Sequence, residues 1–172
     1  MSAVPVVETA RLHLRGFVLA DFPRYAALWA DPAMVRHILP APRGKTESWR
    51  AFQGIAGSWA LCGIGQWAIC LRDSGAVIGH CGFFFGHRGM GADFDAQPEC
   101  GWVLAPEVWG RDYGREAVTA AHGWFDAARP GPSVAMIEDG HRGSERIAAA
   151  LDYRPLRAAG LAGPPVTLYR RG

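Results

Sequence analysis

The chain opens with a stretch in which apolar and polar positions alternate. Leu12 and Leu14 are separated by basic residues over residues 11–15. A period of two is typical of a strand with one buried face. This stretch therefore predicts the first strand of a sheet.

Helical spacing follows this strand. Asp21 is a favourable N-cap, Pro23 is tolerated in a first turn, and the Asp-Pro pair at 31–32 is expected to end the helix. Thr46 is a candidate cap for another helix that continues through Trp49 and beyond. Two helices are thus predicted before residue 66.

The segment 66–85 returns to the spacing of strands. Trp67, Ile69 and Leu71 share one side, and the polar tetrapeptide RDSG at 72–75 suits the turn of a hairpin. A glycine-rich stretch, 86–98, comes next and is predicted to be a mobile loop.

The second half of the chain alternates strands and helices. A strand at 100–104 is closed by Pro106, and apolar residues then recur at helical spacing over 117–128. Further elements are predicted at 133–138 (strand), 144–151 (helix) and 166–169 (strand). With no internal repeat and no long linker, residues 1–172 are predicted to form one α/β (α+β) domain.

Composition and charge narrow the function classes. A net charge of +2 without a dense basic run does not indicate nucleic-acid binding. The first residues lack the pattern of a secretory signal, so a cytoplasmic location is predicted. Residues 51–71 are uncharged, but their glycines and polar side chains make them unsuitable for crossing a membrane. The cysteines lack metal-ligand spacing and are expected to be buried thiols: Cys62, Cys70, Cys81 and Cys100.

The turn at 109–115 carries the strongest chemical signal. It reads WGRDYGR and joins a predicted strand to a predicted helix. The first amides of a helix lack internal partners and lie at the positive end of its dipole. Gly110 and Gly114 permit close approach to the backbone, and Arg111 and Arg115 add positive charge, so the turn predicts a phosphate site.

Other motifs point to no second chemistry. The stretch 63–68, GIGQWA, matches a dinucleotide fingerprint, but that motif needs a strand before it and a helix after it, whereas here a strand follows. No G-x-S-x-G elbow occurs, and the six histidines lack ligand spacing, so no metal is predicted.

Five segments in order resemble the GNAT acetyltransferase superfamily, and within it the branch of the RimJ and RimL ribosomal-protein acetyltransferases. They read ETARLHLR, DPAMVRHI, QWAICLRDSGAVIGHCGF, ECGWVLAPEVWGRDYGREA and HRGSERIAAALDYRP. The resemblance implies a mixed, mostly antiparallel sheet, flanked by helices, in which two neighbouring strands splay apart. It also implies acetyl-CoA as co-substrate.

The resemblance assigns roles along the cofactor. The pantetheine arm is expected to add to the strand edge at 101–104, the amides of 111–115 to hold the pyrophosphate, and the amide of Val103 or Leu104 to polarise the thioester carbonyl. The predicted cofactor-binding residues are Trp102, Val103, Leu104, Trp109, Gly110, Arg111, Asp112, Tyr113, Gly114, Arg115, His141 and Ser144.

Two residues are candidates for catalysis. Glu99 opens the pattern E-x-G-W and is the candidate base, since an amine is mostly protonated at neutral pH; it is alternatively a solvated residue at a strand start. Glu107 is a weaker rival. Many GNAT enzymes protonate the thiolate with a Tyr where this chain has Ala148. Ser144 is the candidate hydrogen-bond donor to the sulfur, or only a helix cap.

The chain departs from the branch pattern at a few positions. Asp112 replaces Gly and either repels the pyrophosphate or caps the helix; His141 replaces Asn, Asp152 replaces Gly, and Tyr153 stands where Phe is usual and is expected in the core.

Two functions therefore remain after sequence analysis. One is an N-acetyltransferase that acts by direct attack of a primary amine, either a protein N-terminus or a small molecule such as an aminoglycoside or polyamine. The other is a non-catalytic acyl-CoA sensor on the same fold. The acceptor pocket is expected around Trp49, Phe52, Trp59 and the loop 86–98, and a homodimer is possible.

Overall fold

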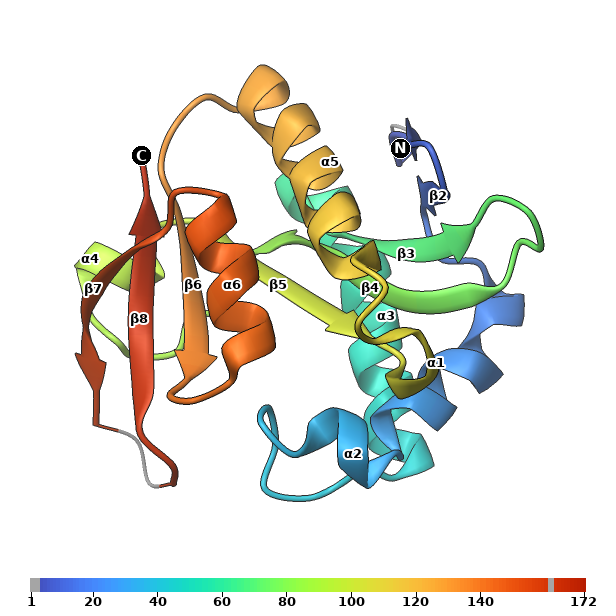
Figure 1. Cartoon of the computed structure of the whole chain (residues 1–172), viewed down its shortest axis with the longest axis horizontal. Coiled ribbons are helices and arrows are strands. Elements are labelled where there is room, and N and C mark those ends of the chain that lie inside the picture. The colour runs from blue at the N-terminus through green and yellow to red at the C-terminus, as the bar shows by residue number, and fades with distance from the viewer. Residues whose placement is uncertain (1–3, 161–162) are drawn as a thin grey trace.

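The computed structural model describes residues 4–160 and 163–172, which form one eight-stranded sheet with helices on both faces (Figure 1). The strands are β1 (Val7–Glu8), β2 (Leu12–Arg15), β3 (Gln66–Leu71), β4 (Val77–Phe84), β5 (Glu99–Leu104), β6 (Ser133–Glu138), β7 (Arg154–Ala159) and β8 (Val166–Arg171). The helices are α1 (Phe22–Trp29), α2 (Pro32–Val35), α3 (Lys45–Cys62), α4 (Ala92–Asp95), α5 (Tyr113–Ala128) and α6 (Arg142–Ala150), with 3-10 turns η1 (Leu19–Asp21) and η2 (Pro106–Val108). The predicted fold class is confirmed.

The sheet consists of two halves that meet at a single point. Its strand order is β1-β2-β3-β4-β5-β6-β8-β7. All neighbours run antiparallel except β5 and β6, which are parallel and are paired in the described chain at one position, Glu99 opposite Val134. Beyond that pair the two strands diverge (Figure 1). The splayed pair expected from the resemblance is therefore present.

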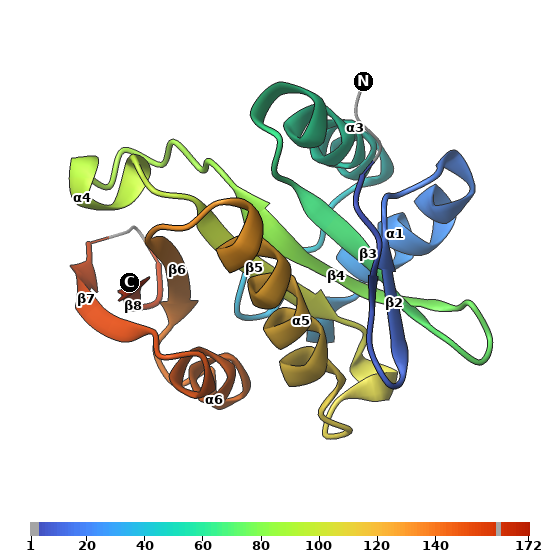
Figure 2. The ribbon, with the colours of Figure 1, turned by 90° about the horizontal axis from the view of Figure 1, so that it is seen from above.

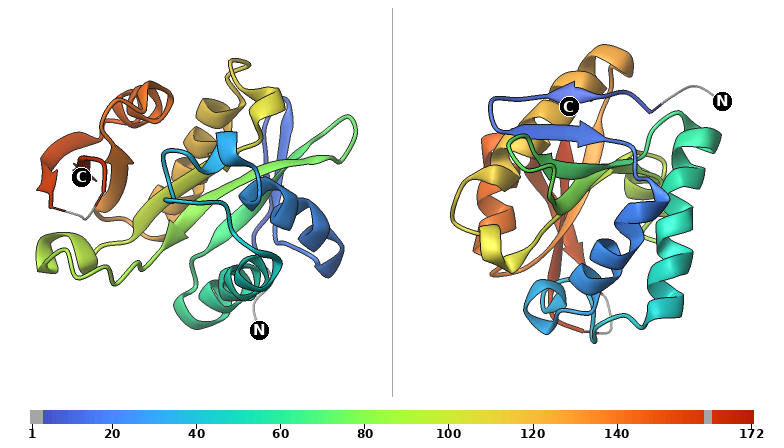
Figure 3. Two further views of the ribbon diagram at one scale, coloured as in Figure 1. Left: turned by 90° about the horizontal axis from the view of Figure 1, so that it is seen from below. Right: turned by 90° about the vertical axis from the view of Figure 1, so that its right-hand side faces the viewer.

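Helices cover the two faces unequally. α1 and α3 lie on one face of the N-terminal half, and α5 crosses the opposite face (Figure 2). α6 packs beside α5 and against β6 (Figure 3). The divergence of β5 and β6 therefore lies between α5 and α6, with the start of each helix near it.

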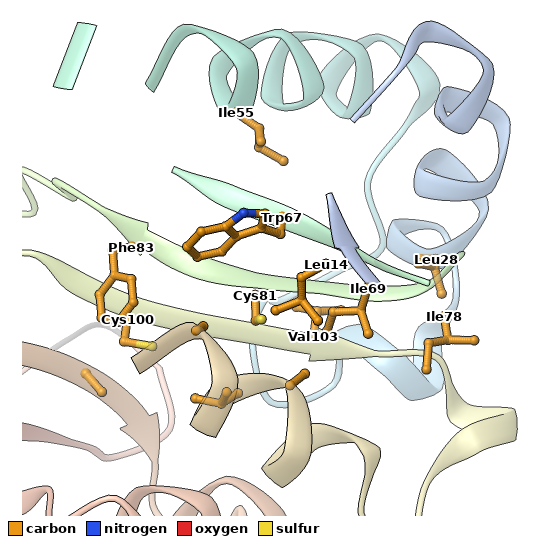
Figure 4. Close-up of a cluster of buried hydrophobic side chains, with 14 of the residues drawn as sticks. Leu14, Leu28, Ile55, Trp67, Ile69, Ile78, Cys81, Phe83, Cys100 and Val103 are labelled. Carbon is orange, nitrogen blue, oxygen red and sulfur yellow. The ribbon is translucent and has the colours of Figure 1, made fainter. Parts of the chain in front are cut away.

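The core fills the space on both sides of β3, β4 and β5 (Figure 4). Trp67 is fully buried, and its indole nitrogen donates to the carbonyl oxygen of Pro5 at 2.7 Å. Phe83 stacks on Phe125 of α5 with ring centroids 3.9 Å apart. This packing makes the N-terminal half the rigid support for the edge of β5.

Tyr153 lies in the core, as predicted, and its hydroxyl group is satisfied there. The phenolic oxygen is 2.9 Å from Nε2 of His122 and 2.7 Å from Oγ of Ser133. Burial lowers the pKa of His122 to about 4, so its ring stays neutral and can pair with a hydroxyl. A Tyr is tolerated where the resemblance leads us to expect Phe, because these two neighbours supply partners for its hydroxyl group.

One of the two predicted helix caps is in place and the other is wrong: Asp21 occupies the N-cap position of α1, whereas Thr46 does not cap α3. The Asp21 carboxylate makes no capping bond; it accepts from the guanidinium of Arg15 at 2.7 and 2.9 Å and from the amide of Val18 at 2.9 Å. Thr46 lies inside α3, which begins one residue earlier, and Glu47 accepts from the amide of Gly44 instead. In both places another acidic interaction competed with the expected cap.

The pattern of apolar and polar residues predicted the hairpin correctly but did not predict β7 or α4. β7 was not predicted, because an edge strand that includes Pro155 and is largely exposed has little alternation. The stretch 86–98 contains α4, where Phe94 is buried. The hairpin with its turn at 72–75 is confirmed. No helix in the described chain is long and apolar enough to cross a membrane.

Candidate active site

The opening between β5 and β6 holds the main cavity of the molecule. Its volume is about 1030 Å³, just above the range of roughly 300–1,000 Å³ usual for ligand sites. The walls come from β5, β6, the start of α6, α3 and the segment 36–43 that follows α2. The cavity can therefore admit an acceptor and the reactive end of a cofactor together.

The structure separates the predicted residues into two groups. Glu99, Trp102, Val103, His141 and Ser144 line the cavity. Leu104 and the turn 109–115 lie outside its lining, at the far end of β5 and the start of α5. This arrangement is what an elongated cofactor needs, because its reactive end and its phosphates lie far apart.

Glu99 is neither solvated nor free. It is 4% exposed, and its two carboxylate oxygens accept from Nε and Nη2 of Arg88 at 2.7 and 2.8 Å. Burial alone would lower the pKa of Arg88, but the bonds to Glu99 outweigh it and raise that pKa. The pair anchors the loop 86–98 to the start of β5, and it occupies the oxygens that a general base would need.

Ser144 faces the cavity from the first turn of α6. Its Oγ accepts from the indole nitrogen of Trp102 at 3.1 Å, which joins α6 to β5 across the opening. It is not the cap of α6, because that position belongs to His141, whose Nδ1 accepts from the Ser144 amide at 3.4 Å. The Ser144 hydroxyl hydrogen donates to no partner in the described chain and remains available to a ligand.

Two residues that were not predicted as site residues complete this wall. Nδ1 of His37 is 2.6 Å from Oε1 of Glu138, and both side chains line the cavity. The His37 ring lies 4.5 Å from that of His141. Burial, reinforced by His37, lowers the pKa of His141, which fits the neutral ring that its capping role requires. The only sequence signal for His37 was its place in the segment DPAMVRHI.

Main-chain groups on β5 alternate between its two neighbours. The amide of Ala105 donates to the carbonyl oxygen of Ile78 beside β4 at 2.8 Å. In an antiparallel pair every second residue turns its N–H toward the partner, so Val103 also faces β4, while the Leu104 amide faces the opening. The carbonyl oxygen of Leu104 is held by the indole nitrogen of Trp109 at 2.8 Å. Of the two predicted amides, this pairing favours Leu104.

The turn at 109–115 has the expected shape but an unexpected ion pair. Gly110 and Asp112 both adopt positive φ angles, 74° and 66°. Asp112 occupies the N-cap position without a capping bond; its carboxylate pairs with the guanidinium of Arg115. The helix therefore begins where the capping alternative placed it, but the carboxylate makes no capping bond, and its hydrogen bonds with Arg115 lower the pKa of Asp112. A positive φ also explains why Gly is usual here, and Asp152, the other Asp in place of Gly, has a φ of 61°.

The start of α5 is held from outside by residues that sequence reasoning missed. The guanidinium of Arg11 donates to the carbonyl oxygen of Arg111 at 3.0 Å and lies 4.3 Å over the ring of Tyr113. Arg11 and Thr9 also bind the carboxylate of Glu116, each at 2.6 Å. These contacts fix the orientation of the first amides of α5.

We next consider the side chains that could bind a metal ion or react as thiolates. Within residues 4–160 and 163–172, no group of three or more His, Cys, Asp or Glu side chains is arranged to hold a metal ion. Cys70, Cys81 and Cys100 are buried and Cys62 is half-buried, all as free thiols. Burial raises the pKa of Cys70 and Cys81, which disfavours their reactive thiolate forms.

Comparison with known proteins identifies the class of enzyme to which this fold belongs. The acetyltransferase (GNAT) domain model matches residues 11–154, so the chain belongs to the GNAT acetyltransferase family. A solved structure assigned to that family, from Bordetella pertussis, is 26% identical; the match covers 98% of this chain and 99% of that one, with a TM-score of 0.87. An acetyltransferase from Agrobacterium tumefaciens str. C58 is 27% identical over 100% and 96% of the two chains, with a TM-score of 0.83.

A more distant structure adds information on the fold alone. RimL, the ribosomal L7/L12 alpha-N-protein acetyltransferase solved in complex with coenzyme A, is 14% identical and covers 97% of each chain with a TM-score of 0.80. The superfamily resemblance is confirmed, and the GNAT fold uses acetyl-CoA as co-substrate. The closer likeness to RimJ and RimL stays a prediction.

Proposed function

We propose that residues 1–172 act as one N-acetyltransferase domain that moves the acetyl group of acetyl-CoA directly to a primary amine while both substrates are bound. The cavity carries this proposal, because it opens at the separated edge of β5 and has room for two substrates. In a ternary complex the amine nitrogen attacks the thioester carbon, the N–C bond forms, and the C–S bond breaks.

The cofactor is proposed to lie along the open edge of β5. Its pantetheine amides would pair with free main-chain groups of that edge, and its pyrophosphate would meet the amides of 111–115. The Leu104 amide would then donate to the thioester oxygen as negative charge develops there. Trp102 and His141 would contact the arm from β5 and α6.

The proton of the attacking amine needs an acceptor, and His37 is the better placed candidate. Its Nδ1 is held by Glu138, which orients the ring and stabilises it once protonated, and Nε2 remains to take the proton. Glu99 is the alternative, but Arg88 would first have to release it. The departing thiolate would accept a hydrogen bond from Ser144 and take its proton from solvent.

The test is release of free CoA from acetyl-CoA on addition of single primary amines, followed by mass spectrometry of the product. At least one amine is expected to gain 42 Da and release one CoA per acetyl group. Acetyl-CoA is also expected to raise the melting temperature, because a ligand that binds only the folded state stabilises it. A melting shift without turnover by any amine would favour the sensor; no shift at millimolar acetyl-CoA would refute the proposed cofactor site.

Replacing Asp112 with Gly is expected to lower the Kd for acetyl-CoA several-fold. The change removes a negative charge beside the proposed pyrophosphate, frees Arg115, and places Gly at a positive φ. Calorimetric titration at low and high salt measures the effect, which should fade at high salt because exposed charges are screened. Asp152→Gly, at an exposed position that also has a positive φ, is the matched control for loss of charge. Weaker binding by the Asp112 variant would mean that its pair with Arg115 organises the turn.

A further inference from the structure

One part of the cavity contains buried polar atoms without partners. Trp29 and His80 line it and are 5% and 2% exposed. The indole nitrogen of Trp29 and both ring nitrogens of His80 make no hydrogen bond within residues 4–160 and 163–172. A buried polar atom without a partner is costly, and such atoms in a native site call for an explanation. A polar group of a ligand would supply the missing partner.

The same place contains a cation without a carboxylate. The guanidinium of Arg43 lies 3.8 Å over the ring of Trp29, and the Arg43 amide donates to the Trp29 carbonyl oxygen at 2.9 Å. No Asp or Glu of the described chain pairs with Arg43. The His80 ring lies 5.7 Å from that of Trp29. Burial, with a contribution from Arg43, lowers the pKa of His80 to about 3, so this ring is neutral and can donate one hydrogen bond.

The charged side chains that line the rest of the cavity also favour a negatively charged ligand. The carboxylates of Glu99 and Glu138 are already bound, by Arg88 and His37. Arg36 and Arg43 line the cavity and have no acidic partner in the part of the chain that the structure describes. An acceptor with several positive charges would meet these guanidinium groups, and repulsion would oppose its binding.

We infer that Arg43, Trp29 and His80 form an acceptor subsite for a carboxylate, so that the amine acetylated by this enzyme carries a carboxylate group. Arg43 offers a charge-assisted hydrogen bond. The indole nitrogen of Trp29 and one ring nitrogen of His80 add neutral donors. Tyr25 also lines this part of the cavity, with its hydroxyl group beside Arg43 and Trp29. The inference rests on the proposed function for its turnover, but not for its binding. The carboxylate is that of an acidic side chain, either in a free amino acid or in a residue near a polypeptide N-terminus.

Matched acceptors test the inference. One pair is free glutamate and glutamine; the other is the peptide amides Ala-Glu-Ala and Ala-Gln-Ala, in which the attacking amine is the same. The carboxylate member of at least one pair is expected to have a kcat/KM about 10- to 100-fold higher, as a hydrogen bond to a charged group provides. The pair in which this difference in kcat/KM appears identifies the source of the carboxylate. Equal rates within both pairs, or faster acetylation of spermidine, would overturn the inference.

Substitutions assign the preference to Arg43. Arg43→Gln should bring the ratio within the favoured pair close to one, while Arg43→Lys should keep part of it because the charge remains. Arg50→Gln, on the exposed face of α3, is the matched control and should leave the ratio unchanged. A ratio unchanged in Arg43→Gln, with the melting temperature preserved, would count against the subsite.

A binding measurement keeps the subsite separate from turnover. Glutarate has carboxylates but no amine, so it cannot be acetylated. It should raise the melting temperature of the unmodified protein and not that of Arg43→Gln. If no amine is acetylated and glutarate still binds through Arg43, the proposed function fails and the subsite stands; if amines are acetylated without preference and glutarate gives no shift, only the subsite fails.

Discussion

His37→Gln is expected to lower kcat/KM by about 10²- to 10⁴-fold near neutral pH, the usual contribution of a general base. Gln keeps a polar side chain that can face Glu138 but cannot accept the proton. The deficit should shrink as pH rises through the reference pKa of an α-amine, about 8, because the amine then loses its proton to solvent. A pH profile of kcat/KM measures both effects. Glu138→Gln should give a smaller loss, since the Gln oxygen can still orient the ring and only the charge that stabilises the protonated ring is removed.

The chain offers a matched control for this substitution. His13 also pairs with a glutamate, Glu8, but it lies on β2 and does not line the cavity. His13→Gln should therefore retain activity and the shape of the pH profile. Binding of acetyl-CoA should not change in any of the three variants. A His37→Gln enzyme with an unaltered pH profile would remove His37 from the mechanism.

Glu99→Gln is expected to reduce stability more than it reduces the rate. The substitution leaves the Arg88 guanidinium without its carboxylate in a partly buried place, where a lost charged partner costs on the order of 1–3 kcal/mol. For a chain of this size that corresponds to a fall in melting temperature of roughly 2–12 °C. Thermal unfolding measured with and without acetyl-CoA would show it.

A double-mutant cycle with Arg88→Gln separates the two roles of Glu99. If the pair is structural, the double variant should lose less stability than the sum of the single variants, because the second change removes nothing that is still paired. If Glu99 is the base, Glu99→Gln alone should lose about 10²-fold or more in rate and recover it at high pH. A large, pH-dependent loss of rate with unchanged stability would restore Glu99 to the mechanism in place of His37.

Much of the fold could be predicted because its elements leave local signals. The strand Ser133–Glu138 is bounded by a Pro-Gly-Pro sequence, and α5 begins at Tyr113, directly after a turn with its own motif. The failures have a local cause too. β7 is an exposed edge strand, so its pattern lacks the buried face that alternation reports. A capping hydrogen bond is a short-range interaction that an ion pair can replace, as at Asp21, which holds the N-cap position of α1 while its carboxylate pairs with Arg15.

Candidate site residues could be predicted where they are neighbours in sequence, and they could not be predicted where folding brings them together. The turn at 109–115 and the end of β5 form one continuous motif, so composition and resemblance both found them. His37 and Glu138 are 101 residues apart, and Arg43 meets Trp29 and His80 only in the folded chain. Glu99 shows the limit of a motif, because the motif placed it at the start of β5, where it lines the cavity, while its partner, Arg88, comes from a loop without any signal.

The strand order β6-β8-β7 has a consequence for biosynthesis. β1 to β5 pair mainly with neighbours in sequence and can assemble as the chain emerges from the ribosome. β6 and β7 cannot complete their ladder until residues 166–171 have been made, because β8 lies between them. The wall that carries Glu138 is therefore expected to be the last to form. A nascent chain that ends at Ala159 would hold a finished platform for the cofactor and no enclosed place for the acceptor.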